Sequence, residues 1–287
     1  MKITNETNLP APLVAALRDD GYSRGQADIS ATGLISPARK VALEEKHADL
    51  LTEDAADLAA ILIGKAVHEK IAAKATGELS DKKRLMMQVN GWTVSGQTDH
   101  VDIGGEVVTI RDGIITDYKT TSVNEWKYGL KEERASQLNI YAELLRSHGY
   151  TVTGLSATLI FKDWAATRHA FEKDYPPHSI VEVDVPLWTQ EQAQHYILER
   201  VLAHQAARRD PGVLCSEEER WVRTKYAVVK GQNKRATRLF ETQDEAEEFA
   251  LTDPQYRVEI RGGEPVRCLY FCSVGRLGLC QQWNGEQ

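Results

Sequence analysis

The chain has 287 residues, of which 42% are hydrophobic and 27% charged, a composition typical of a globular protein and unlike that of a disordered one. Its formal net charge of −7 argues against a protein that coats nucleic acid through bulk positive potential. No apolar run approaches the roughly 20 residues that span a bilayer, and the start of the chain lacks the apolar segment of a signal peptide. We therefore expect a cytoplasmic protein with no membrane partner.

The first part of the chain predicts helices. A loop enters a helix near Ser30 and Thr32, which are candidate N-caps. Residues 40–73 predict a long helical stretch with a break where Thr52 can cap a second helix. On that second helix, His68 lies at the edge of a mostly apolar stripe.

The middle of the chain changes to a hydrophobic period of two. Residues 85–121 alternate in this way between glycine-containing turns, which predicts three or four antiparallel strands. Helices are expected at 133–150 and 189–208. Two further strands are predicted between them, at 152–164 and 179–188. Strands and helices mixed in this order predict an α/β fold, with a central mixed sheet flanked by helices.

The C-terminal part differs from what precedes it. Residues 216–267 predict a hairpin, a short helix and one more strand, which together form a small α+β insert. We therefore expect a core at 1–215, this insert, and a cysteine-bearing tail at 268–287. The insert contains a basic cluster, KGQNKR at 230–235, which is either a solvated turn or a phosphate contact.

The four cysteines are concentrated toward the C-terminus. Cys268, Cys272 and Cys280 lie in the tail, and Cys215 precedes the insert. Because disulfides are rare in the cytoplasm, this arrangement favours metal or cluster ligands. No CxxC pair is present, which weakens a zinc-ribbon interpretation. Small buried cysteines that pack as apolar side chains are the alternative.

Several common catalytic motifs are absent. The segment VHEKIA has alanine where a HExxH metalloprotease needs its second histidine. IGKAV lacks the first glycine and the Ser or Thr of a phosphate-binding loop, and neither GxSxG nor GxGxxG occurs. Kinase, hydrolase and dinucleotide-binding functions thus lose their main support.

A different site is indicated by the segment GIITDYKTT. Asp117 and Lys119 lie two residues apart on a predicted strand, so their side chains share one face. An exposed ion pair at a strand end is one interpretation. However, Asp99 ends an earlier predicted strand and His68 lies on the preceding helix, and two carboxylates with an imidazole suit a divalent cation. A lysine beside them suits the polarisation of an attacking water.

Four short motifs follow one another along the chain: GKAVH (64–68), GQTD (96–99), DYK (117–119) and QLNIY (137–141). In the last of them, Gln137 and Tyr141 share one face of a helix. The ordered set resembles the RecB-like branch of the PD-(D/E)XK nucleases. The cysteine pattern resembles the iron–sulfur members of that branch, such as the CRISPR-associated RecB-like exonucleases, and the whole is similar to phage-encoded nucleases.

The resemblance implies a restriction-endonuclease-like fold and a role for each matching residue. The implied ligands of Mg²⁺ or Mn²⁺ are His68, Asp99, Asp117 and the carbonyl of Tyr118. Lys119 would orient or activate the water, while Gln137 and Tyr141 would hold the metal-ligand strand and contact DNA. Asp102 is the alternative to Asp99 as a ligand, and Tyr141 could instead be a core aromatic with a bonded hydroxyl.

The resemblance also concerns the cysteines and the DNA. The implied ligands of a 4Fe-4S cluster are Cys215, Cys268, Cys272 and Cys280. The gap between the last two is wider than the family pattern, so Zn²⁺ remains an alternative. Further DNA contacts are expected at Ser30, Arg39, Lys230, Lys234 and Arg235.

The function implied by the resemblance is a metal-dependent DNA exonuclease. It would act on single strands or DNA ends in phage-type recombination, replication or repair, with recombination or replication proteins as partners. Its location would be the bacterial cytoplasm, which is the host cytoplasm if a phage encodes it. A cysteine-stapled DNA-binding or assembly factor with a vestigial site is one alternative, and a structure-specific or sequence-specific endonuclease is another.

Overall fold

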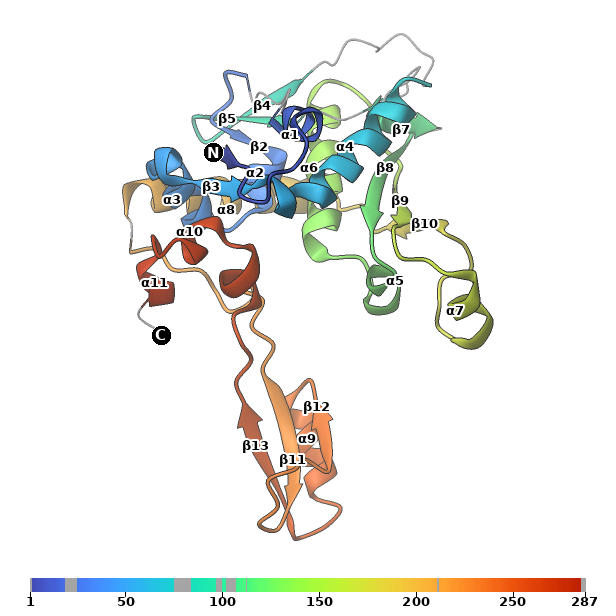
Figure 1. Ribbon diagram of the computed structural model, residues 1–287, viewed down its shortest axis with the longest axis vertical. Coiled ribbons are helices and arrows are strands. Elements are labelled where there is room, and N and C mark those ends of the chain that lie inside the picture. Colours follow the sequence, from blue (N-terminus) through green and yellow to red (C-terminus); the bar gives the residue numbers. More distant parts are fainter. Residues whose placement is uncertain are drawn as a thin grey trace. The chain divides into compact units, whose positions relative to one another are not determined.

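The chain divides into two compact units. Figure 1 shows the ribbon, coloured along the sequence from blue at the N-terminus to red at the C-terminus. The larger unit contains Met1–Ala38 and Thr52–Arg209, and the smaller unit contains Arg39–Leu51 and Asp210–Gln287. The computed structural model describes residues 2–18, 25–74, 84–96, 100–101, 107–111, 113–210 and 212–284.

A five-stranded mixed sheet is the framework of the larger unit, in the order β10-β9-β8-β7-β6. Its strands are β6 (His100–Val101), β7 (Val107–Arg111), β8 (Ile114–Thr121), β9 (Gly154–Phe161) and β10 (Ile180–Val185). β8 pairs parallel with β9 and antiparallel with β7, while β10 pairs antiparallel with β9. The predicted α/β class with a mixed sheet is therefore confirmed.

Other strands of the larger unit form two smaller sheets. One contains β2 (Ile29–Ser30), β5 (Trp92–Gly96) and β4 (Leu85–Val89), and the other pairs β1 (Lys2–Thr4) with β3 (Thr52–Asp54). The expectation of one antiparallel set over 85–121 is wrong, because β4 and β5 belong with β2, and β6 runs parallel to β7. A period of two identifies strands without identifying their partners, since every half-buried strand has that period.

The helices of the larger unit include the expected long ones, at 59–72, 132–147 and 190–209, and three short ones, at 11–18, 124–128 and 166–171, that the sequence did not predict. They are α1 (Ala11–Arg18), α2 (Ala31–Ile35), η2 (Ala55–Leu58), α4 (Ala59–Ala72), α5 (Asn124–Tyr128), α6 (Glu132–Ser147), α7 (Ala166–Phe171) and α8 (Gln190–Arg209). Ser30 caps α2, as expected, by accepting a hydrogen bond from the Gly33 amide. Thr52 is not a cap, because it pairs with β1 in a sheet, and the carboxylate of Asp54 accepts the Ala56 amide instead.

Two helices cover opposite faces of β8. A Cβ placed on Gly64 of α4 would lie 3.5 Å from Oγ1 of Thr120, whereas Lys119 hydrogen-bonds to Gln137 of α6. Because neighbouring residues of a strand point to opposite faces, α4 and α6 lie on either side of the strand. The α6 side contains the main hydrophobic core, around Ile115 and other buried residues of α6 and β9.

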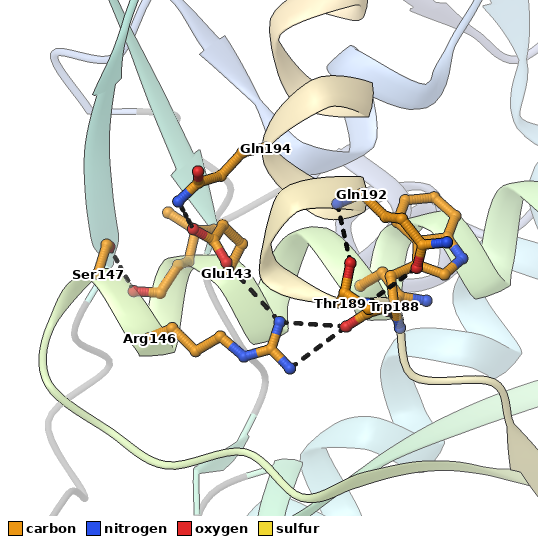
Figure 2. Close-up of polar contacts among 9 residues, drawn as sticks. Glu143, Arg146, Ser147, Trp188, Thr189, Gln192 and Gln194 are labelled. Carbon is orange, nitrogen blue, oxygen red and sulfur yellow. Dashed lines mark hydrogen bonds and ion pairs between the residues drawn. The ribbon is translucent and has the colours of Figure 1, made fainter.

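Polar contacts fix the outer face of α6 to the start of α8, as Figure 2 shows. Nε2 of Gln194 donates to Oε1 of Glu143 at 2.7 Å, and the guanidinium of Arg146 donates to the Trp188 carbonyl at 3.4 Å. In addition, the amide of Trp188 donates to Oδ1 of Asn139 at 2.8 Å. These bonds leave α6 little freedom to rotate, so the residues on its other face are held in place as well.

The smaller unit combines an N-terminal segment with the C-terminal part of the chain. Its elements are α3 (Ala38–Lys46, whose first residue belongs to the larger unit), η1 (Ala48–Leu50), β11 (Lys225–Lys230), β12 (Arg238–Phe240), α9 (Gln243–Ala250), β13 (Tyr256–Arg261), η3 (Arg267–Phe271), α10 (Ser273–Arg276) and α11 (Gln281–Asn284). The segment 39–51 was expected in the core at 1–215. It groups here because Leu43 and Leu51 pack with Val274 and two buried cysteines.

The insert has the elements that the sequence predicts. β11 lies between β12 and β13 in an antiparallel sheet, and α9 packs against it. No described helix in either unit is both long enough and apolar enough to cross a membrane.

Candidate active site

Asp117 and Lys119 form a buried ion pair on β8. The carboxylate of Asp117 belongs to a residue that is only 4% exposed, and its Oδ2 lies 2.9 Å from Nζ of Lys119. A buried carboxylate is costly unless a partner compensates its charge. The shared face that the sequence predicts therefore exists, and it points into the protein toward α6.

A chain of hydrogen bonds continues from the lysine to α6 and α2. Nζ of Lys119 donates to Oε1 of Gln137 at 3.2 Å, and Nε2 of Gln137 donates to Oη of Tyr141 at 2.9 Å. The same Nε2 also donates to Oγ1 of Thr32 at 3.2 Å. Sequence reasoning treated Thr32 only as a candidate helix cap, because nothing local indicates its distant partner.

Glycine is required where β5 approaches Tyr141. A Cβ at Gly96 would lie 2.5 Å from Cδ1 of Leu144 and 2.9 Å from two ring carbons of Tyr141. The end of β5 thus contacts α6 directly. Asp99 and its alternative Asp102 both lie outside the described residues.

The other two predicted metal ligands within the described residues lie on α4 and on β8. His68 is on α4, one helical turn after Gly64, and its Nδ1 is buried. Tyr118 is half-buried on β8 between Asp117 and Lys119. Within the described ranges, no three His, Cys, Asp or Glu side chains lie close enough together to hold a metal ion. The described structure thus joins four of the predicted residues, Asp117, Lys119, Gln137 and Tyr141, and leaves the complete ligand set untested.

Asp117 differs from the other buried acid near this end of β8. Glu125 of α5 is 6% exposed, and its two oxygens accept hydrogen bonds or ion pairs from Thr121 and Arg134. By contrast, the buried Oδ2 of Asp117 has Nζ of Lys119 at 2.9 Å and no hydrogen bond from any described residue. Sequence reasoning did not identify Glu125, whose bonds give it a structural role. A buried carboxylate whose oxygen faces only a lysine ammonium fits a residue that binds a cation.

The four cysteines line one cavity in the smaller unit, together with Arg39 and Lys40. Nε of Arg39 donates to Sγ of Cys280 at 3.3 Å. Burial raises the pKa of the Cys215 thiol to about 12 and also raises the pKa of the Cys272 thiol. Without a ligand these two thiols are therefore protonated at neutral pH.

A glycine permits the close approach of two of these cysteines. A Cβ at Gly275 would lie 3.0 Å from the carbonyl oxygen of Cys268 and 3.4 Å from Cβ of Cys272. Larger residues would force this turn apart. The tail is therefore shaped so that thiols distant in sequence face one space.

The expected DNA contacts fall in different environments. Ser30 caps α2, and Arg39 is only 6% exposed and donates to Cys280 and to the carbonyl of Val213. Lys230 forms an ion pair with Asp253. The side chains of Lys234 and Arg235 are exposed. Ser30, Arg39 and Lys230 thus make contacts within the protein. DNA contact by any of the five residues stays a prediction.

Comparison with known proteins adds the family. Residues 26–221 match the PD-(D/E)XK nuclease superfamily. No curated protein matches the chain. Among solved structures, one titled "Crystal structure of SSO0001" is similar over 66% of this chain and 83% of its own, with 15% sequence identity and a TM-score of 0.44. On the family match, which covers both the DYK and the QLNIY motifs, the chain belongs to the PD-(D/E)XK nuclease superfamily.

Proposed function

We propose that this protein is a metal-dependent DNA exonuclease that acts on single strands or DNA ends. The observation that carries the proposal is the buried pair of Asp117 and Lys119, in which Oδ2 of Asp117 has a cation on one side and no hydrogen bond from a described residue. Metal-dependent nucleases of the PD-(D/E)XK superfamily need a carboxylate that binds the metal ion and a lysine that lies beside the scissile phosphate.

The donor set suits Mg²⁺ or Mn²⁺, which prefer oxygen ligands. We assign the ligands to Asp117, Asp99, His68 and the carbonyl of Tyr118. A bound divalent ion would supply Lewis-acid stabilisation of the negative charge that develops on the phosphate. It would also offset the repulsion between DNA and the carboxylates, so activity requires the ion.

Lys119 is held by the protein in a geometry that leaves it available to substrate. Its ammonium has three N–H groups, of which one faces Asp117 and one donates to Gln137. The third can donate to a water or a phosphate oxygen. Because Tyr141 and Thr32 fix the amide of Gln137, the lysine keeps this orientation before substrate arrives.

Exposed aromatic side chains favour single strands as the substrate. Tyr128 on α5 is 79% exposed and Phe171 on α7 is 90% exposed. The two short helices are linked by the ion pair of Lys127 with Glu172, and α5 follows directly after β8. Stacking of an unpaired base on an aromatic ring contributes roughly 1–3 kcal/mol, and duplex DNA cannot offer its bases in this way.

We also propose that Cys215, Cys268, Cys272 and Cys280 hold a 4Fe-4S cluster, with Zn²⁺ as the alternative. The support is that all four line one cavity although the insert separates the first from the others. A cluster or Zn²⁺ bound there would link Cys215, near the start of the C-terminal segment of the smaller unit, to the three cysteines near its end. Metal analysis by mass spectrometry and the visible absorption spectrum distinguish iron and sulfide from zinc.

A role in phage-type recombination, replication or repair, with proteins of those processes as partners in the cytoplasm, completes the proposal. It rests on the resemblance of the motifs. A structure-specific endonuclease is the second candidate within the same chemistry, since the Asp117 and Lys119 pair serves both.

The test is a nuclease assay on protein purified without oxygen. End-labelled single-stranded and double-stranded DNA and closed circular DNA are incubated with Mn²⁺ or with chelator. We expect Mn²⁺-dependent degradation of linear single strands that falls by about 10²-fold or more in Lys119→Ala, by analogy with removal of one transition-state contact. The matched control is Lys162→Ala, which removes an exposed lysine just after β9.

The outcomes separate the alternatives. Cutting of closed circles would establish an endonuclease. Metal-dependent DNA binding without degradation, unchanged in Lys119→Ala, would instead identify an assembly factor with a vestigial site.

A further inference from the structure

The loop between β11 and β12 concentrates positive charge in an otherwise acidic protein. Residues 230–240 contain Lys230, Lys234, Arg235 and Arg238 and no acidic residue, whereas the whole chain has a net charge of −7. Charge of one sign on a single loop is common on solvated surfaces. The contacts that each side chain makes decide whether this loop can bind a ligand or is only a solvated surface.

Two of the four cations belong to the fold of the insert. Nζ of Lys230 lies 2.6 Å from Oδ2 of Asp253, and it also lies over the ring of Tyr256. The guanidinium of Arg238 lies 4.8 Å from the ring centre of Phe240 and 5.4 Å from that of Phe249. These contacts stabilise the insert and leave little of either cation for a ligand.

Two arginines of β13 hold the backbone of the loop. Nη1 of Arg257 donates to the carbonyl of Gly231, and Nη2 of Arg261 donates to the carbonyl of Lys234 at 2.9 Å. The amide of Thr237 donates to the carbonyl of Val228 at 2.8 Å, which closes the loop. A loop held at both ends and at its centre presents its side chains without a large loss of conformational entropy.

Lys234 and Arg235 are the side chains that this arrangement presents. Both are exposed, and neither forms an ion pair or a side-chain hydrogen bond with a residue that the structure describes. Elsewhere in the insert, Lys225 pairs with Glu241 and Arg257 pairs with Glu259. Adjacent cations that remain unpaired on a rigid loop favour an anionic partner.

Four of the insert's acidic residues lie together on the helix that covers one face of its sheet. α9 carries Asp244, Glu245, Glu247 and Glu248, and its Phe249 contacts Phe240 and Tyr256. Because Arg257 follows Tyr256 on β13, its side chain points to the face that α9 does not cover. The positive loop is thus held from the sheet face that α9 does not cover, where Glu259 pairs with Arg257 and Arg261. A polyanion can therefore approach the loop without meeting the carboxylates of α9.

We infer that the loop from 231 to 237 binds the phosphodiester backbone of DNA through Lys234 and Arg235, independently of base sequence. This rests on the proposed function for the identity of the polyanion. It assigns the insert a role in holding substrate that is separate from the Asp117 and Lys119 site. Backbone recognition follows from the chemistry presented, which is two cations and no exposed aromatic ring on the loop.

The experiment measures DNA affinity against salt concentration. Fluorescence anisotropy of a labelled 30-nucleotide single strand is recorded with the full-length protein and without added Mg²⁺ or Mn²⁺, which prevents cleavage. Each phosphate contact contributes about 0.7 to the slope of log K against log salt for a single strand. We therefore expect Lys234→Ala/Arg235→Ala to reduce the magnitude of the slope by about 1.4.

Matched variants keep the result specific. Lys2→Ala/Lys46→Ala removes the same charge at two exposed lysines elsewhere and should leave the slope unchanged. Lys234→Arg/Arg235→Lys keeps both charges and should also bind as the wild type does. Because both loop residues are exposed, thermal unfolding of the three variants is expected to match the wild type.

The inference and the proposed function can fail separately. If the slope of the Ala variant equals that of the wild type, or if the Lys2 and Lys46 control changes it equally, the loop does not bind DNA. If the slope falls as expected but the wild type degrades no DNA with Mn²⁺, the loop contact stands and the nuclease proposal is overturned.

Discussion

The two units differ in what fills their interiors. Among its described residues, the larger unit has a core of 22 buried apolar residues that connects the five-stranded sheet and the β2-β5-β4 sheet with α6 and α8. Among the described residues of the smaller unit, the cluster at the cysteines has five buried residues, two of which are Cys272 and Cys280, and the insert adds only Ala227, Val228, Val229 and Ala246. Since burial of apolar surface is the main stabilising contribution in folding, the larger unit can be stable by itself, whereas the smaller unit is short of core.

The two units also differ in whether their buried polar groups have protein partners. In the larger unit, Glu125 and Asn139 have protein partners on each side. In the smaller unit, thiols with raised pKa values line a cavity. Small domains without enough core commonly depend on a bound metal. We therefore propose that the smaller unit assembles around a ligand at its cysteines, whereas the larger unit is held by its apolar core.

The largest effect is expected from removal of the proposed cluster or Zn²⁺ at the cysteines. Structural metal sites contribute on the order of 10 kcal/mol to folding, so stripping the metal or cluster should expose 210–284 to protease while 113–209 stays resistant. Limited proteolysis with mass spectrometry, beside iron and zinc analysis, measures this. A cleavage pattern that is identical before and after stripping would show that the smaller unit is stable without a ligand, and would remove the contrast between the units.

An intermediate effect is expected from Gly96→Ala in the larger unit. The added Cβ would overlap Leu144 and the ring of Tyr141, so we expect a loss of about 1–3 kcal/mol in the free energy of unfolding. Urea denaturation measures it, and nuclease activity should fall too because Tyr141 fixes Gln137. The matched control is Gly262→Ala, where a Cβ meets nothing within 4 Å. Equal stability of the two variants would mean that the close approach of β5 to α6 is not required.

The smallest effect is expected from the surface ion pairs of the larger unit. Hydrogen bonds from Arg168 and Lys127 lower the pKa of Glu172 from 4.5 to about 2. A lowered folded-state pKa means that the stabilisation is present above pH 4.5 and is lost as the pH falls toward 2. Thermal unfolding of Glu172→Gln should therefore differ from the wild type at pH 6 and approach it at pH 2.5.

The size of the change in thermal unfolding of Glu172→Gln shows how much surface ion pairs contribute to the larger unit compared with its core. Surface ion pairs contribute little in general, so a shift smaller than that of Gly96→Ala would confirm that the core holds the larger unit. Glu248→Gln in the smaller unit is the control, because Glu248 forms no ion pair with a described residue. A larger effect of Glu172→Gln than of Gly96→Ala would contradict this order.

Local spacing in the sequence determined much of the candidate site. Residues two apart on a strand and four apart on a helix must share a face, so Asp117 with Lys119 and Gln137 with Tyr141 were predictable from their positions alone. The elements of the insert were predictable for the same reason. The order of the four motifs was enough to indicate the family that the comparison shows.

Tertiary structure alone decided how distant segments meet. It brought Thr32 to Gln137, packed Gly96 against Tyr141, and placed Arg39, an expected DNA contact, against Cys280. It also grouped 39–51 with the C-terminal unit. The physical reason is that the period of a helix or strand depends only on nearby backbone geometry, whereas packing partners depend on the shape and volume of surfaces that no local pattern encodes.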